Sequence, residues 1–245
     1  MSETPRLEIE ALDAWYGAAR ILFGVSLHVG RGEAVALIGR NGAGKSTTMK
    51  AVMGLVTRRA ARLDVEGRDL RALPTYEIAR HGVGYVPEDR RIFTELTVAE
   101  NLDIGRRPRP AGTAPDLPDW TPQALFALFP NLAEMQDRPG GAMSGGEQQM
   151  LAIARTLVGQ PRLLLLDEPS EGVAPVIVDQ MIHALHTLKR AGLSMLIAEQ
   201  NLDLCRSLCD RAYVIEQGEL RWHGAMAELE EEALFGRVAP TNGIM

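Results

Sequence analysis

The sequence predicts an α/β fold: a mostly parallel, doubly wound sheet with an N-terminal antiparallel β subdomain and an inserted helical subdomain. Short apolar runs without polar alternation, Glu33–Gly39, Arg162–Asp167 and Leu193–Ala198, are typical of strands that are buried on both faces. Helical patterns lie between these runs, and alternating strands and helices favour a parallel sheet. A glycine-rich loop, Gly39–Ser46, follows the first of these strands and precedes a helix.

The first part of the chain combines two kinds of strand. Apolar and polar residues alternate in Leu7–Tyr16 and Ile21–Val29, which predicts two strands of an antiparallel sheet. After the glycine-rich loop, the apolar residues of Lys45–Leu55 have helical spacing. Further elements are expected in this order: a strand at Arg62–Glu66, a helix near Pro74–Arg80 and a strand at Val83–Pro87.

From Thr97 to about Gly159 the pattern is helical and is broken by a proline-rich loop, Pro108–Pro118. After the proline-rich loop we expect helices at Gly145–Val158 and Pro175–Arg190. A terminal hairpin of Arg211–Glu216 and Glu219–Trp222 follows them. We therefore expect a single domain, residues 1–245, in which 1–87 and 160–245 form the α/β core and 88–159 form the helical subdomain.

Composition and charge limit the classes of function. The formal net charge of −6 gives no overall attraction for nucleic acid or anionic lipid. No apolar stretch approaches the ~20 residues that a membrane-spanning helix needs, and the N-terminus lacks the basic-then-apolar pattern of a signal peptide. Two cysteines agree with a reducing compartment. We therefore expect a cytosolic protein without a transmembrane segment.

The loop after the first buried strand has the pattern of a phosphate-binding loop. Its glycines let the backbone wrap closely around phosphate oxygens, and the helix that follows directs its positive end at the same anion. Lys45 can reach the β- and γ-phosphates, and the Ser46 hydroxyl is a hard oxygen ligand for Mg²⁺. The alternative is a glycine-rich turn with an incidental lysine, which the strand–loop–helix context disfavours. The candidate nucleotide-binding residues here are Gly39, Arg40, Asn41, Gly42, Ala43, Gly44, Lys45, Ser46 and Thr47.

Two carboxylates end the second buried strand. Asp167 and Glu168 follow four leucines, which places them at the carboxyl end of a central strand, where α/β sheets bind ligands. Asp167 suits Mg²⁺, and Glu168 can accept a proton from an attacking water. The alternative is a solvated acidic turn, which would be favoured without the preceding phosphate loop.

A third motif, Ser144-Gly145-Gly146, begins a predicted helix. A serine before two glycines at a helix start makes a second terminus that suits an anion. An ordinary helix cap is the alternative, and for an isolated Ser-Gly-Gly it would be favoured. The combination and order of the three motifs argue against it.

This order of motifs resembles that of the ATP-binding cassette (ABC) ATPases over essentially the whole chain. Within that family the sequence looks most like the ATPases of branched-chain amino-acid importers, the LivF type, and related urea and short-chain amide importers share the pattern. The stretches that carry the resemblance are Tyr85–Phe93, Met143–Arg155, Asp167–Pro175 and Ala198–Asn201. The resemblance implies the P-loop NTPase fold, with ATP and Mg²⁺ bound.

The resemblance also implies partners. Ser144, Gly145 and Gly146 would close over the γ-phosphate of a nucleotide on a second ABC ATPase subunit, so that a homo- or heterodimer forms two composite sites. Pro169–Pro175 is similar to the loop that crosses this interface, with Glu171 in place of the usual small or apolar residue. The further partners implied are two transmembrane permease subunits and, through them, an extracytoplasmic solute-binding protein. The chain would then lie at the cytoplasmic face of the inner membrane, and no nucleic acid is expected.

Three more positions receive roles from the resemblance. Tyr16 stands where an aromatic residue stacks on adenine, with Trp15 as competitor and packing on the sheet as the alternative. Glu88 replaces the usual glutamine and remains a hard oxygen donor for Mg²⁺ or water. Gln200 replaces the usual histidine at the γ-phosphate, so it keeps an N–H donor but does not titrate. A surface acid and a polar residue at a helix start are the alternatives for Glu88 and Gln200.

The sequence thus indicates the ATPase subunit of an importer for branched-chain amino acids or related small polar solutes, with Glu168, Lys45, Glu88 and Gln200 as catalytic candidates. One alternative is a soluble ABC ATPase that acts on nucleic acid or the ribosome; the single cassette, the absence of heptads and the acidic balance disfavour it. Another is a non-hydrolysing, ATP-dependent regulatory module, against which the intact Lys45, Asp167 and Glu168 argue. The transported solute is not encoded in this chain.

Overall fold

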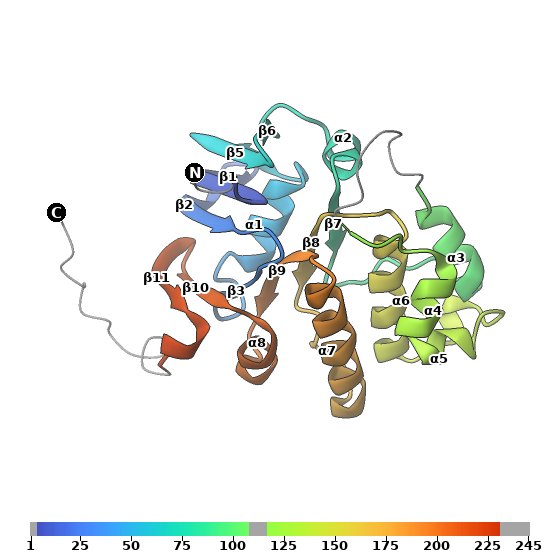
Figure 1. The fold of residues 1–245 in the computed structure, drawn as a ribbon. Coiled ribbons are helices and arrows are strands. Elements are labelled where there is room, and N and C mark those ends of the chain that lie inside the picture. Colours follow the sequence, from blue (N-terminus) through green and yellow to red (C-terminus); the bar gives the residue numbers. More distant parts are fainter. Residues whose placement is uncertain (1–3, 108–116, 231–245) are drawn as a thin grey trace.

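The structure, a computed structural model, describes residues 4–107 and 117–230, and in these the chain forms two sheets with helices around them (Figure 1). The first sheet is antiparallel, with five strands in the order β2-β1-β5-β6 and β4 paired to β1. Its strands are β1 (Leu7–Tyr16), β2 (Ala19–Val29), β4 (Thr57–Arg59), β5 (Arg62–Val65) and β6 (Arg68–Asp69).

The second sheet contains six strands in the order β11-β10-β3-β9-β8-β7. All its pairs are parallel except β10 with β11, which form the terminal hairpin. Its strands are β3 (Ala34–Ile38), β7 (Val83–Val86), β8 (Leu163–Asp167), β9 (Ser194–Glu199), β10 (Arg211–Glu216) and β11 (Glu219–Ala225). Because β3, β8 and β9 are parallel neighbours, the residues that follow them meet at one edge of this sheet.

The helices cover the sheets unevenly. Figure 1 shows α3–α6 grouped at one end of the molecule, beyond β7, whereas α1 lies between the two sheets and contacts both. No helix in the described part of the chain has the length and apolar character of a membrane span. The helices are α1 (Lys45–Val52), α2 (Thr75–Arg80), α3 (Val98–Gly105), α4 (Pro122–Leu128), α5 (Pro130–Ala133), α6 (Gly145–Leu157), α7 (Pro175–Arg190) and α8 (Leu202–Leu208), with 3₁₀ turns at Gly140–Ala142 and Met226–Glu228.

The predicted fold class is confirmed, and most elements end within a few residues of their predicted bounds. Strand β1 and helix α7 match the prediction, whereas β11 continues to Ala225, past the predicted end at Trp222. The sequence did not reveal β4 or β6, because each is too short to show a clear periodicity, and a helix start near Gln200, where α8 follows, was considered only as the alternative for that residue. Most of the predicted loop Pro108–Pro118 lies outside the described residues.

The core has two layers, one on each face of the parallel sheet. Leu164 and Leu166 of β8 pack with the helices α3–α8, while Leu163 and Leu165 pack with α1 and the antiparallel sheet. All four leucines are fully buried, as the uninterrupted apolar run predicts for a central parallel strand. The first layer joins residues from 88–159 and from the α/β core in one cluster, so the boundary of the helical subdomain stays a prediction.

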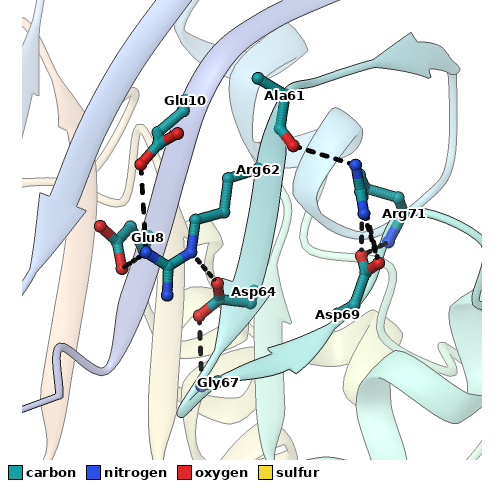
Figure 2. A network of polar contacts seen from close by, with 8 residues as sticks. All are labelled: Glu8, Glu10, Ala61, Arg62, Asp64, Gly67, Asp69 and Arg71. Carbon is teal, nitrogen blue, oxygen red and sulfur yellow. Dashed lines mark hydrogen bonds and ion pairs between the residues drawn. The ribbon is translucent and has the colours of Figure 1, made fainter.

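Charged contacts hold the register of the antiparallel sheet. Glu8 of β1 stands opposite Asp64 of β5, and two like charges in such a pair repel each other. Arg62 lies between the two carboxylates and binds both, and Arg71 forms a separate ion pair with Asp69 (Figure 2). The exposed pair of Arg71 with Asp69 contributes roughly 0–1 kcal/mol. Asp64 is buried, so its ion pair with Arg62 compensates a charge that would otherwise oppose this pairing with Glu8.

Candidate active site

The glycine-rich loop runs from the end of β3 to the first residue of α1 and is held by close packing. A Cβ atom on Gly39 would meet the Ile215 carbonyl oxygen at 2.4 Å, and one on Gly44 would meet Leu22 Cδ2 at 2.8 Å. Gly44 also has a φ of 114°, which side chains on an L-residue rarely allow. Glycine is therefore required at both ends of the loop. Between them, Arg40, Asn41 and Gly42 are exposed and Ala43 is buried, as is Thr47 in α1.

Lys45 is almost fully buried, and its ammonium group points back into the loop. Nζ donates hydrogen bonds to the carbonyl oxygens of Gly39 at 2.7 Å and Arg40 at 3.0 Å. It also forms an ion pair with Glu168 Oε1 at 2.9 Å, and this buried pair joins the loop to the end of β8. A positive charge is therefore held at the concave side of the loop, opposite a carboxylate.

Ser46 and Asp167 form the second link between α1 and β8. Ser46 Oγ donates to Asp167 Oδ1 at 2.9 Å, and Asp167 is buried at the carboxyl end of its strand. Tyr85 of β7 donates its hydroxyl proton to Asp167 Oδ2 at 3.0 Å. Burial raises the pKa of Asp167, and these two hydrogen bonds partly oppose that rise. Tyr85 was missed as a site residue, because a tyrosine in a strand carries no local signal of what it contacts across the sheet.

Glu168 follows β8 in a left-handed backbone conformation, with a φ of 47°. Burial raises the pKa of its carboxyl, but the hydrogen bond with Glu171 and the ion pair with Lys45 outweigh burial and lower the pKa below its usual value. Glu171 is exposed, and its pKa is raised to about 7, chiefly by the hydrogen bond and the charge of Glu168. Below about pH 7 the proton of this pair therefore favours Glu171, and Glu168 favours the ionised form.

Gln200 connects the loop to the same carboxylate. Its Nε2 lies 2.6 Å from Asn41 Oδ1 and 3.3 Å from Glu168 Oε2. The turn that carries Gln200 is fixed by Glu199, a buried carboxylate that the sequence did not single out. Glu199 accepts hydrogen bonds from the backbone N–H groups of Gln200 at 2.9 Å and Ser170 at 2.8 Å, so it ties together the turns after β9 and β8.

The Ser-Gly-Gly motif lies apart from this cluster. Ser144 caps α6 in a capping box, in which Ser144 Oγ accepts from the N–H of Glu147 and the Glu147 carboxylate accepts from the N–H of Ser144. Gly146 is buried against α7, where a Cβ would meet Ile177 Cγ2 at 2.7 Å. Within the described residues, no hydrogen bond or ion pair joins Ser144, Gly145 or Gly146 to Lys45, Asp167 or Glu168. In one chain, the cluster of Lys45, Asp167 and Glu168 and the Ser-Gly-Gly motif are therefore two separate sites.

The remaining candidates, Glu88 and Tyr16, are exposed. Glu88 follows β7 and acts on the cluster through its charge, since it contributes to the raised pKa of Glu171. Tyr16 is 46% exposed and shares a face of β1 with Ala14, whose partner in β2 is Leu22, the residue beside Gly44. Trp15 points to the opposite face, where the guanidinium groups of Arg20 and Arg59 stand over its ring. The geometry favours Tyr16 over Trp15 as a residue near the loop.

Known proteins are similar to this chain in sequence and in fold. The sequence profile described as "ABC transporter" matches residues 22–171. The chain is 42% identical over 225 residues to the high-affinity branched-chain amino acid transport ATP-binding protein BraG of Pseudomonas aeruginosa, with 91% of this chain and 94% of BraG covered. It is 35% identical over 223 residues to the lipopolysaccharide export system ATP-binding protein LptB of Escherichia coli K12, with 91% of this chain and 92% of LptB covered.

Solved structures of ATP-binding cassettes have a similar fold. The structure described as an ATP-binding subunit of an ABC transporter gives a TM-score of 0.76 at 28% identity, over 89% of each chain. A nucleotide-free ATP-binding cassette from an ABC transporter also gives 0.76, at 27% identity, over 90% of this chain and 91% of that chain.

Proposed function

The chain belongs to the ABC transporter family and is an ATP-binding, ATP-hydrolysing subunit of a transporter; we propose that this transporter imports branched-chain amino acids or related small polar solutes such as urea and amides. The identity to BraG supports this solute class. The observation that carries the ATPase function is the meeting of Lys45, Ser46, Asp167 and Glu168 where β3 and β8 end.

In the proposed reaction, the loop N–H groups and Lys45 bind the β- and γ-phosphates of ATP. The phosphates compete with Glu168 for the Lys45 ammonium, so nucleotide binding breaks the buried ion pair and leaves the Glu168 carboxylate free. Glu168 then accepts a proton from the attacking water. The hydrogen bonds of Glu168 with Glu171 and Gln200 do not depend on Lys45; both lower its pKa and so favour the ionised form that this role needs, and Gln200 holds its second oxygen in place.

The chemistry of the donors fits Mg²⁺. Ser46 Oγ and Asp167 Oδ1 are hard oxygen donors in hydrogen-bond contact, and the carboxylate stands in a buried position next to the loop. We propose that these two residues hold the ion, with Glu88 as a ligand for it or for its water. When bound, Mg²⁺ would neutralise charge on the phosphates.

The separation of Ser144–Gly146 from Lys45 and Glu168 supports a dimer. We propose that a second ABC ATPase subunit places its own Ser-Gly-Gly motif over the nucleotide of this chain, with the subunits arranged head to tail about a two-fold axis. Two transmembrane permease subunits would then receive the motion through the Glu88 region, and an extracytoplasmic solute-binding protein would deliver the solute. This arrangement places the chain peripherally at the cytoplasmic face of the inner membrane. We keep residues 88–159 as the proposed helical subdomain.

The test is ATP hydrolysis by the transporter assembled in membrane vesicles with its permease subunits and solute-binding protein. Leucine, isoleucine, valine, urea and a short-chain amide are added one at a time. We expect one of these solutes to raise the rate of hydrolysis and to accumulate inside the vesicles. Stimulation by none of them, or by lipopolysaccharide instead, would contradict the proposed solute class while leaving the ATPase function intact.

A further inference from the structure

Arg90 lies where three segments of the proposed site meet. It stands two residues after Glu88, and its guanidinium lies against Gly145, the first residue of α6: a Cβ on Gly145 would meet Arg90 Nη1 at 2.9 Å and Cζ at 3.4 Å. Arg90 Nη2 would lie 3.9 Å from a Cβ on Gly172, in the loop that follows Glu168. One side chain therefore lies against the Ser-Gly-Gly motif and close to this loop.

The Arg90 guanidinium is not held beside Gly145 by an ion pair. Within residues 4–107 and 117–230, no carboxylate or carbonyl oxygen pairs with the Arg90 side chain, and its Nε is buried without a hydrogen-bond partner. A cation beside the first turn of a helix is also unfavourable, because that end carries a partial positive charge. An arginine that only stabilised the chain would be expected to have an anionic or carbonyl partner.

The backbone around Arg90 is held from the same helix. Arg90 and Arg91 both have left-handed conformations, with φ of 61° and 49°, which is uncommon for residues with side chains. Arg155, near the other end of α6, donates through Nη2 to the carbonyl oxygens of Arg91 at 2.6 Å and Arg90 at 3.4 Å. Helix α6 therefore contacts this turn at two places, through Gly145 and through Arg155. Two such contacts fix both the position and the angle of the helix relative to Glu88.

We propose that Arg90 is a positioning residue, whose guanidinium acts as a spacer that sets the first turn of α6 and the Gly172 loop relative to the turn of Glu88. Ser144–Gly146 must present its N–H groups to a nucleotide on the partner subunit, and small displacements of such groups cost much of their effect. The inference rests on the proposed composite site. It adds that the Glu88 turn and the Ser-Gly-Gly motif move as one unit because Arg90 fills the space between them.

The experiment measures two equilibria in the full-length Glu168→Gln chain, together with the partner ATPase subunit where the dimer is mixed. Nucleotide affinity is measured at low protein concentration with a fluorescent ATP analogue, and ATP-dependent dimerisation by sedimentation velocity. The variants are Arg90→Ala and Arg90→Lys. The matched control is Arg91→Ala, since Arg91 has the same backbone conformation but an exposed ion pair with Asp89.

Both Arg90 variants should bind nucleotide within about twofold of the parent chain, because Arg90 does not touch the phosphate loop, but should dimerise at least about tenfold more weakly. Lysine should not rescue dimerisation, because it lacks the flat guanidinium that lies on Gly145. Arg91→Ala should match the parent in both measurements.

Three results would count against the role of Arg90: unchanged dimerisation, rescue by lysine, or an equal loss of nucleotide binding and dimerisation, which indicates general damage to the fold. If the parent Glu168→Gln chain itself fails to dimerise with ATP, the proposed composite site is wrong, and this inference is overturned with it.

Discussion

The Tyr85 hydroxyl donates to a buried carboxylate oxygen of Asp167, a residue 82 positions away in the sequence. Tyr85→Phe removes this donor and leaves Asp167 Oδ2 without it in a buried site. We expect the variant to lose about 1–3 kcal/mol of unfolding free energy in the absence of nucleotide. Urea denaturation measures the change, with Tyr76→Phe as control, because Tyr76 is exposed. An equal loss in both variants would mean that the Asp167 contact contributes nothing specific.

The carboxyl pair of Glu168 and Glu171 makes stability depend on pH. The pKa of Glu171 is raised to about 7 in the folded chain, against 4.5 as its ordinary value, so the folded state binds more protons between these two pH values. Glu171 therefore stabilises the folded chain fully below about pH 4.5, and this stabilisation is lost as the pH rises through about 7.

Glu171→Gln removes this titration. We compare the difference in melting temperature between the variant and the unmodified chain at two pH values. This difference should favour the variant more at pH 8 than at pH 5, by the equivalent of about 1 kcal/mol after allowance for solvent screening at an exposed group. Calorimetry without nucleotide or Mg²⁺ at both pH values measures the difference. The exposed Glu95 supplies the control, Glu95→Gln. A difference that is the same at both pH values contradicts the raised pKa of Glu171.

At the scale of elements, the phosphate-loop helix α1 depends on a residue of β4 at its C-terminal end. Arg58 is half-buried and donates hydrogen bonds to the carbonyl oxygens of Ala51, Val52 and Leu70. Ala51 and Val52 belong to the last turn of the helix, where the Ala51 carbonyl also accepts from the N–H of Gly54, and a cation is favourable at that end. Arg58 therefore caps α1 and anchors it to the antiparallel sheet.

Arg58→Ala should destabilise the chain by about 2–3 kcal/mol, because several charge-assisted hydrogen bonds are lost and the Val52 carbonyl loses its side-chain donor. Arg68→Ala in the edge strand β6 should change stability by less than about 0.5 kcal/mol, because Arg68 is exposed. Chemical denaturation of both variants makes the comparison. Similar stabilities for the two would show that Arg58 does not cap the helix.

At the scale of the whole molecule, one chain carries only half of each proposed composite site. Glu168→Gln keeps the shape of the proposed base but removes its ability to take a proton. We expect this variant to bind ATP, to form a more persistent dimer and to lose turnover by at least about a hundredfold. Steady-state hydrolysis and sedimentation velocity with and without ATP test this. Hydrolysis near the unmodified rate would exclude Glu168 as the base.

Some of the molecule could be predicted because the signals are local. Leu163–Leu166 is apolar at every position, which only a strand covered on both faces tolerates, and Asp167 and Glu168 directly follow it. The loop Gly39–Ser46 contains glycines where close packing excludes a Cβ. The positions of this strand, of the loop and of the two acidic residues could therefore be predicted from the sequence alone. Membership in the ABC transporter family could be predicted in the same way.

The tertiary structure decided which side chains meet. Lys45 forms its ion pair with Glu168 only because β3 and β8 both lie beside β9 in one parallel sheet. For the same reason Gln200 contacts Asn41, which is 159 positions away in the sequence. The roles of Tyr85, Glu199 and Arg90 could not be read from the sequence, because a contact across a sheet or between a turn and a helix leaves no periodic pattern in the chain. The sequence by itself determined where the phosphate loop and the acids stand. Only the folded chain determined which charges are compensated, because compensation depends on distance in space.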